Sequence, residues 1–206
     1  MISSAQVKDV PAAAPAVGHH AARAVTSDRS QPGFLALVRE DWITNGRDWT
    51  RPGFRAMFMY RLGVWRMGIE TRLVRAPFSV LYRALHRYIR NHYGIELHDT
   101  TMIGRRLLIA HQGAIVVHEH ATIGDDCIIR QGVTIGAAGE YDPEKAPRLG
   151  DGIDVGAGAI IIGAVTIGDG ARIGPNAIVM SHVPAGAVAT AAPARIIQLP
   201  AARTKI

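Results

Sequence analysis

The sequence predicts a three-sided parallel β-helix that follows a small α-helical region. Aliphatic residues recur at every sixth position in the C-terminal half, at Leu149, Val155, Ile161, Ile167, Ile173 and Val179. An earlier run keeps the same step, at Val117, Ile123, Ile129 and Ile135. An α-helix repeats after about 3.6 residues and a single strand after about two, so neither explains this period. A chain that turns a corner after every side of a triangular coil does.

The third observation is the small residue that follows most aliphatic positions, as in Ile123-Gly124, Leu149-Gly150 and Ile167-Gly168. We expect each aliphatic side chain to point into the prism, and the small residue to let the chain bend beside it. Prisms of this kind are seldom complete alone. We therefore expect a homotrimer with its active sites between neighbouring copies.

The regions before the prism differ in composition. Residues 1–33 are rich in Ala, Ser, Val and Pro without periodicity, which predicts a disordered N-terminal tail. They lack the long apolar core of a secretory signal. Residues 34–93 have helical spacing. The apolar side of the first expected helix is formed by Phe34, Leu35, Val38 and Trp42. The break at Arg51-Pro52-Gly53 separates it from a second, with Phe54, Met57, Phe58, Leu62 and Trp65.

A third helix is expected from about Pro77 to His92, with an apolar stripe of Val80, Leu81, Leu85, Tyr88 and Ile89. Its other face carries Arg83, Arg87 and Arg90. A basic amphipathic helix can lie on a membrane, so peripheral membrane contact is one interpretation. A solvated face, or one that meets an acidic partner, is the more common alternative and the one that we favour.

Residues 94–197 form the predicted β-helix. The spacing between Ile109 and Val117 contains two extra residues, so the first coils are less regular. Residues 137–148 interrupt the repeat with the polar segment AAGEYDPEKAPR, which we expect to be extruded as a functional loop. Residues 198–206 are expected to form a loose tail.

Composition limits the class of protein. The chain has 206 residues, a formal net charge of +6 and a pI near 10.0. A basic surface without a specific partner is the simplest interpretation, and we expect no nucleic-acid partner. Cys127 is the single cysteine, which excludes an intramolecular disulfide and favours a reducing, cytoplasmic location. It stands at an inward position, so we interpret it as core. The charge-free stretch 155–168 is shorter than the roughly 18–20 residues of a membrane span.

The candidate catalytic residues are His111, in the first irregular coil, and Glu96, fifteen residues earlier. In a coil of about 18 residues, that separation can return the chain to nearly the same edge. A carboxylate beside an imidazole fixes its tautomer, and such a histidine can deprotonate an alcohol that attacks an acyl carbon. An ordinary surface histidine at a turn is the alternative.

Two other kinds of site were considered. His118, Glu119 and His120 could join His111 in a zinc site, but their spacing does not repeat from coil to coil, so we expect no metal. Backbone amides beside small residues suit a long thin ligand, and Gly136, Ala137, Ala157 and Gly158 are such places. Arg172 and Arg195 could meet its phosphates. The simpler interpretation of each glycine is a coil corner.

A specific likeness rests on these residues. Residues 94–197 resemble the catalytic half of the serine acetyltransferase family of left-handed β-helix, hexapeptide-repeat acyltransferases. The shared stretches are GIELH, MIGRRLLIAH, IVVHE, ATIGDD, QGVTIG, GDGIDVGAGAIIIG, VTIGDGARIGPNAIV and PARII. Upstream, REDW and RPGFRAMFMYRLGVWR resemble the end of the family's helical domain more weakly.

The resemblance implies an acetyl-CoA-dependent O-acetyltransferase that transfers acetyl directly to an alcohol. His111 matches the general base, and Glu96 matches the acidic residue that orients it. Gly136, Ala157 and Arg172 match the acetyl-CoA groove, with the PARII segment nearby. Backbone N–H groups would hold the oxyanion of the tetrahedral intermediate.

Two departures concern the acceptor. Ala110-His111 replaces the usual Asp-His pair, and Lys145-Ala146-Pro147 replaces an Arg-His-Pro in the loop. The chain is closer in character to the colanic acid, exopolysaccharide type, with Val64-Trp65-Arg66 and an AP-x-x-V-L-Y-R pattern from Ala76 to Arg83. We therefore expect a sugar hydroxyl as acceptor, bound with the help of Glu119, Tyr141 and Lys145. Serine O-acetylation and a non-catalytic scaffold are the alternatives.

Overall fold

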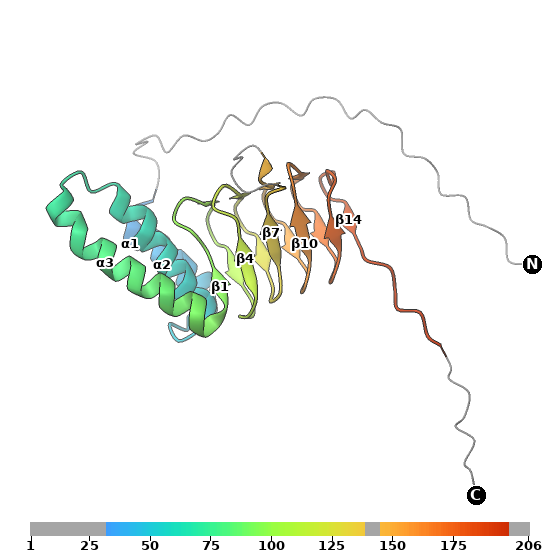
Figure 1. Ribbon diagram of the computed structural model, residues 1–206, viewed down its shortest axis with the longest axis horizontal. Coiled ribbons are helices and arrows are strands. Elements are labelled where there is room, and N and C mark those ends of the chain that lie inside the picture. Colours follow the sequence, from blue (N-terminus) through green and yellow to red (C-terminus); the bar gives the residue numbers. More distant parts are fainter. Residues whose placement is uncertain (1–31, 139–144, 198–206) are drawn as a thin grey trace, which may run out of the picture. The chain divides into compact units, whose positions relative to one another are not determined.

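The computed structural model describes residues 32–138 and 145–197 (Figure 1). Helices α1 (Phe34–Thr44), α2 (Pro52–Met67) and α3 (Arg72–Tyr88) come first, and a π-helical turn, η1 (Ile89–Tyr93), continues α3. Short parallel strands follow, and the fold is the predicted left-handed β-helix preceded by a helical region. Most of the expected N-terminal tail and the whole expected tail 198–206 lie outside the described residues.

The strands form three parallel sheets, one on each face of the prism. Face A contains β1 (Ile95–Glu96), β4 (Ile115–Val117), β7 (Thr134–Gly136), β10 (Ile160–Ile162) and β13 (Ile178–Val179). Face B contains β2 (Met102–Ile103), β5 (Thr122–Ile123), β8 (Arg148–Leu149) and β11 (Thr166–Ile167). Face C contains β3 (Leu108–Ile109), β6 (Ile128–Ile129), β9 (Asp154–Val155), β12 (Arg172–Ile173) and β14 (Val188–Ala189).

The six-residue repeat corresponds to the interior of the prism. Its aliphatic residues form one continuous buried core, in which Ile135, Ile161 and Ile167 have no exposed surface. Burying such a side chain contributes about 1.5–3 kcal/mol, and that gain recurs at every side of every coil. Cys127 belongs to this core, as predicted, and burial raises the pKa of its thiol to about 11.

Strand pairing locates the irregular coils. Val116 pairs with Thr134, eighteen residues later, which is the regular length of a coil. In the first coil Ile95 pairs with Ile115, so this coil is two residues longer. Thr122 pairs with Arg148, the last residue of the expected loop 137–148, which the structure places in β8; the corner before β8 adds eight residues without shifting the pairing register. Both irregularities therefore lie at corners and leave the three faces intact.

The small residues after the aliphatic positions have a role beyond the one that we expected. Gly124 does not adopt the left-handed backbone region. Instead, a Cβ at Gly124 would lie 2.5 Å from the carbonyl carbon of Gly150 in the next coil. The close approach of stacked coils therefore requires a glycine here, in addition to any freedom it gives the chain to bend. Left-handed residues instead mark other corner positions, such as Gly158, with φ +69°.

The helical region packs on the first coil through a buried polar cluster. Arg61 of α2 donates from Nε to Asp41 Oδ2 of α1 at 2.8 Å, and both residues are buried. The same guanidinium donates to the carbonyl oxygens of Ile103 and Gly104. Asn45, also buried, donates to the carbonyl oxygen of Leu107. These bonds connect both helices to the end of the prism.

Helix α3 begins at Arg72, five residues before the expected start at Pro77. A proline inside a helix leaves the carbonyl four residues earlier without its N–H partner. Here that carbonyl belongs to Leu73, a residue that is 86% exposed. Within residues 32–138 and 145–197, no helix combines the length and the apolar character that crossing a bilayer requires.

Candidate active site

His111 lies in the lengthened corner between β3 and β4. It is exposed, and the extra residues bring Gly113 and Ala114 to φ values of +109° and +50°. The N–H of Gly132 in the next coil donates to the carbonyl oxygen of Gly113 at 2.8 Å, which fixes this corner loop to the prism. The histidine therefore stands on an irregular corner of an otherwise repetitive wall.

A hollow of about 280 Å³ adjoins His111, and its other side is the start of α2. Arg51, Pro52 and Gly53 line it together with Ile109, Ala110, His111 and Gln112. A Cβ on Gly53 would lie 2.7 Å from Asn45 Oδ1 and even closer to the Ile109 carbonyl oxygen, so glycine allows the helix to start here. From the sequence we predicted a chain break at this segment and a weak family resemblance from Arg51 onward, but no hollow. The signal that could have pointed to this segment was its place in the RPGF stretch.

Glu96 belongs to β1 on face A. It pairs in register with Val116, which is five residues after His111. Its Oε1 lies 3.4 Å from Nε2 of His98. Among the described residues no hydrogen bond or ion pair joins Glu96 to His111. The orienting role of Glu96 stays a prediction.

The partner of Glu96 belongs to a cluster that the sequence analysis missed. His98 lies two residues after Glu96, and its ring centroid is 5.4 Å from that of His86 on α3. Nε2 of His86 is buried and has no hydrogen-bond partner within the described ranges. The i, i+2 spacing of Glu96 and His98 was the available signal, since such residues share one side of a strand.

The His86 environment predicts a pH-dependent stability. Burial lowers the pKa of His86 below its ordinary 6.5, and the nearby positive groups of His98 and Arg90 lower it further. The carboxylates of Glu96 and Asp99 raise it, but by less. The unfolded chain therefore takes up this proton at a higher pH than the folded protein. The associated stability is fully present above the ordinary pKa and is lost as pH falls below it.

We expect the melting temperature to fall between about pH 7.5 and pH 5.5, and to fall less in His86→Leu. Differential scanning fluorimetry at fixed protein concentration measures both slopes. His92→Leu, a change at an exposed histidine, is the matched control and should keep the wild-type slope. Equal slopes for His86→Leu and the wild type would contradict the assignment.

The candidate acetyl-CoA residues fall on two edges of the prism. Ala157 and Gly158 lie between faces C and A, on the same edge as His111. Here the Gly158 N–H donates to the Gln131 carbonyl, and the Asn176 N–H donates to the Ala157 carbonyl. His111 and Gly158 are two coils apart along this edge, and stacked strands are about 4.8 Å apart. Gly136 and Ala137 lie instead at the far end of face A, where β7 leads into the loop.

The candidate phosphate-binding arginines are both exposed. Arg172 of β12 is on face C, beside the edge of His111, and pairs in register with Asp154. That carboxylate already binds Arg130, whose Nη1 donates to it. Within the described residues, Arg172 has no ion pair. Arg195 lies in the extended segment after β14.

Two of the candidate acceptor residues, Lys145 and Glu119, lie on corners between faces A and B. Lys145 accepts a backbone hydrogen bond from the Ala138 N–H at 3.3 Å, which closes the base of the 137–148 loop. Glu119 is exposed at the corner after β4, 3.8 Å from His120 Nε2. Tyr141 lies outside the described residues.

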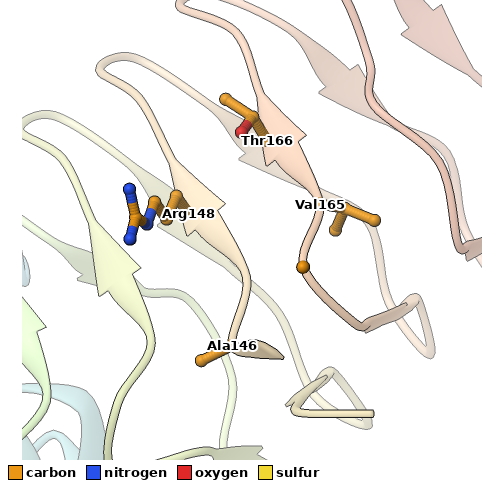
Figure 2. Close-up of a pocket in the computed structure, with 5 residues that line it drawn as sticks. Ala146, Arg148, Val165 and Thr166 are labelled. Carbon is orange, nitrogen blue, oxygen red and sulfur yellow. The ribbon is translucent and has the colours of Figure 1, made fainter. Parts of the chain in front are cut away.

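A second hollow, of about 350 Å³, adjoins the same loop base. Ala146, Arg148, Ala164, Val165 and Thr166 line it (Figure 2). Arg148 and Thr166 are register partners on adjacent strands of face B. No group of three or more His, Cys, Asp or Glu residues suited to a metal ion occurs in the part of the chain that the structure describes.

Fold and candidate site together define the class, a left-handed hexapeptide-repeat β-helix with a helical region before its first coil. No protein-family model matches the chain. Serine acetyltransferase of Helicobacter pylori strain 26695 is 39% identical over 116 residues, which are 56% of this chain and 64% of that protein. WcaB of Escherichia coli K12, a protein assigned to colanic acid biosynthesis as an acetyltransferase, is 39% identical over 105 residues, 50% of this chain and 62% of WcaB.

The soybean serine acetyltransferase apoenzyme structure matches with a TM-score of 0.65 and 31% identity, over 82% of this chain and 70% of that one. A serine acetyltransferase solved in complex with CoA and the soybean enzyme solved with serine match with the same TM-score of 0.64. The chain belongs to the serine acetyltransferase family. The match spans slightly less than two thirds of the curated relatives' own length.

Proposed function

We propose that this protein is an acetyl-CoA-dependent O-acetyltransferase and that His111 is its general base. The supporting observation is an exposed histidine, on an irregular corner beside a hollow, in a member of this family. His111 would take the proton of the acceptor hydroxyl while that oxygen attacks the thioester carbonyl. The carbon–sulfur bond then breaks, and the CoA sulfur leaves as a thiolate that is protonated.

CoA would lie along the edge that carries His111, Ala157 and Gly158. Ala157 and Gly158 are small and partly exposed, so a long ligand can approach the backbone closely at this corner, and Arg172 stands beside the edge without an ion pair in the described ranges. A serine acetyltransferase of similar fold was solved in complex with CoA, which supports CoA as the ligand. Arg195, Gly136 and Ala137 would reach the ligand from other parts of the site.

We propose a homotrimer because the candidate residues of one chain occupy two different edges. His111 adjoins one hollow, between faces C and A, and Ala146 adjoins the other, between faces A and B. A threefold assembly of prisms brings one edge of each copy against the other edge of its neighbour. The site would then combine His111 of one copy with Glu119, Tyr141 and Lys145 of the next, and Glu96 would position His111 there. The single cysteine fits a cytoplasmic enzyme.

The acceptor that we propose is a sugar hydroxyl of an exopolysaccharide precursor. An amino acid's charged ends would meet two positions that are uncharged in this chain. One is Ala110, beside His111, and the other is Ala146, in the second hollow. Charge-assisted hydrogen bonds contribute about 1.5–3 kcal/mol each, so their absence disfavours a free amino acid. The likeness to WcaB supports the same choice.

We expect acetyl transfer from acetyl-CoA to sugars or lipid-linked oligosaccharides, and little transfer to L-serine. Thiol release and product mass analysis measure turnover with each acceptor, and His111→Ala provides the background. Rapid turnover of serine at low KM, with no sugar active, would overturn the sugar assignment and favour serine O-acetylation, in line with relatives that are named serine acetyltransferase. No stabilisation by CoA and no turnover would favour a scaffold.

A further inference from the structure

Helix α3 has an outer side that is apolar and exposed. Leu73, Val74, Val80, Leu81 and Tyr88 are between 41% and 86% exposed. Their spacing of seven and eight residues places them on one side of the helix. The opposite side, with Tyr82 and Ile89, is buried against the rest of the fold. The exposed side is therefore not needed for the packing of α3.

An aromatic residue extends this exposed side. Trp65 of α2 is 40% exposed and makes an edge-on contact with Phe78 of α3, with 5.0 Å between ring centroids. Phe78 itself is only partly exposed. Trp65 and Tyr88 thus add amphipathic aromatic rings to the outer surface, the residue types that gather at the boundary between lipid headgroups and acyl chains.

A row of arginines runs beside the apolar side. Its members are Arg72, Arg83, Arg87 and Arg90, all exposed. Helix α3 contains no acidic residue, and none of these arginines forms an ion pair within residues 32–138 and 145–197. Arginines elsewhere in the described structure commonly do, as the pairs at Arg61, Arg66, Arg105, Arg106 and Arg130 show. The positive charge on α3 is thus left uncompensated.

We propose that the outer side of α3 binds the surface of an anionic lipid bilayer. The arginine row would meet lipid phosphates, and the apolar side would enter the headgroup boundary. Charge complementarity favours this occupant over a second copy, since two such helices face to face would bring their arginine rows together. The exposed apolar side favours a bilayer over a purely acidic soluble partner. The inference does not depend on the acceptor or on catalysis.

The test is flotation of the full chain with vesicles. We expect binding to phosphatidylcholine vesicles that contain roughly 30% phosphatidylglycerol, little binding to pure phosphatidylcholine, and release by high salt. The pair Arg83→Gln/Arg87→Gln should weaken partitioning about 25-fold, at about fivefold for each charge. Leu73→Ser/Leu81→Ser should weaken it as well. The charge-matched control, Arg39→Gln/Arg47→Gln, removes exposed arginines outside α3 and should bind nearly as well as the wild type.

Several results would overturn the proposal. They are equal binding to neutral and anionic vesicles, equal losses for the control pair and the α3 pair, and no binding at all. If Leu73→Ser/Leu81→Ser lowers the mass found by light scattering while vesicle binding is unchanged, a second copy covers this side instead. His111→Ala should bind vesicles like the wild type, so failure of the catalytic assignment would be visible separately.

Discussion

Replacing His111 with alanine is expected to lower kcat/KM for acetyl transfer by about 10²–10⁴-fold, the usual contribution of a general base. The residue lies on the lengthened corner of the first coil, beside the hollow that the start of α2 closes. It has no hydrogen bond or ion pair in the described part of the chain, so its loss should leave the fold unchanged. Steady-state kinetics with acetyl-CoA and the active acceptor measure the effect.

Two controls separate catalysis from binding. CoA should still raise the melting temperature of His111→Ala, because a ligand that binds the native state stabilises it. His92→Ala, at an exposed histidine of η1, should keep full activity.

Glu96→Gln should lower kcat and alter the pH profile if Glu96 positions His111 in the assembled enzyme. Near wild-type activity of His111→Ala would show that another group is the base.

Replacing Arg61 with methionine is expected to destabilise the fold by about 3–5 kcal/mol, because it removes one partner of a buried ion pair. Asp41 has no exposed surface, and the guanidinium also satisfies the carbonyl oxygens of Ile103 and Gly104. Chemical denaturation at fixed protein concentration measures the change. Arg39→Met, at an exposed arginine of α1, should change stability little.

The loss caused by Arg61→Met should depend on pH. Burial raises the pKa of Asp41, and the hydrogen bond from Arg61 opposes that effect. In Arg61→Met that opposing hydrogen bond is lost, so the pKa of Asp41 in the folded protein rises further above the ordinary 3.8. The free energy of unfolding then falls as the pH rises through this folded-state pKa. The variant should therefore be closer to the wild type at about pH 5 than at pH 7.5, and Asp41→Asn/Arg61→Met should lose this dependence. A pH-independent loss would contradict it.

The fold could be predicted because one repeat fixes the inward side of every strand. The positions from Val117 to Val179 that share the six-residue step are buried. Periodicity reports burial but not the reason for each glycine, so the close approach at Gly124 was missed. The start of α3 was missed because a proline usually marks a helix start, whereas Pro77 is tolerated where Leu73, four residues earlier, is exposed.

The site was harder to predict because it depends on how coils stack. The two extra residues beside His111 were visible in the sequence, and they shift the pairing so that Val116, rather than Ala114, lies opposite Glu96. The hollow beside His111 needs α2, a contact between segments far apart in the chain. The roles of His111 and Glu96 stay predictions, and so does the trimer. The proposed site is formed between copies of the chain, and the structure describes a single copy.

The uninterrupted register across the 137–148 segment has a consequence for how such proteins diversify. Thr122 pairs in register with Arg148 at the end of the segment, although eight extra residues precede that strand. The length and sequence of this corner can therefore change without changing the strand pairing of the β-helix. Chimeras that receive this segment from relatives with other acceptors should fold normally and inherit a donor-like selectivity.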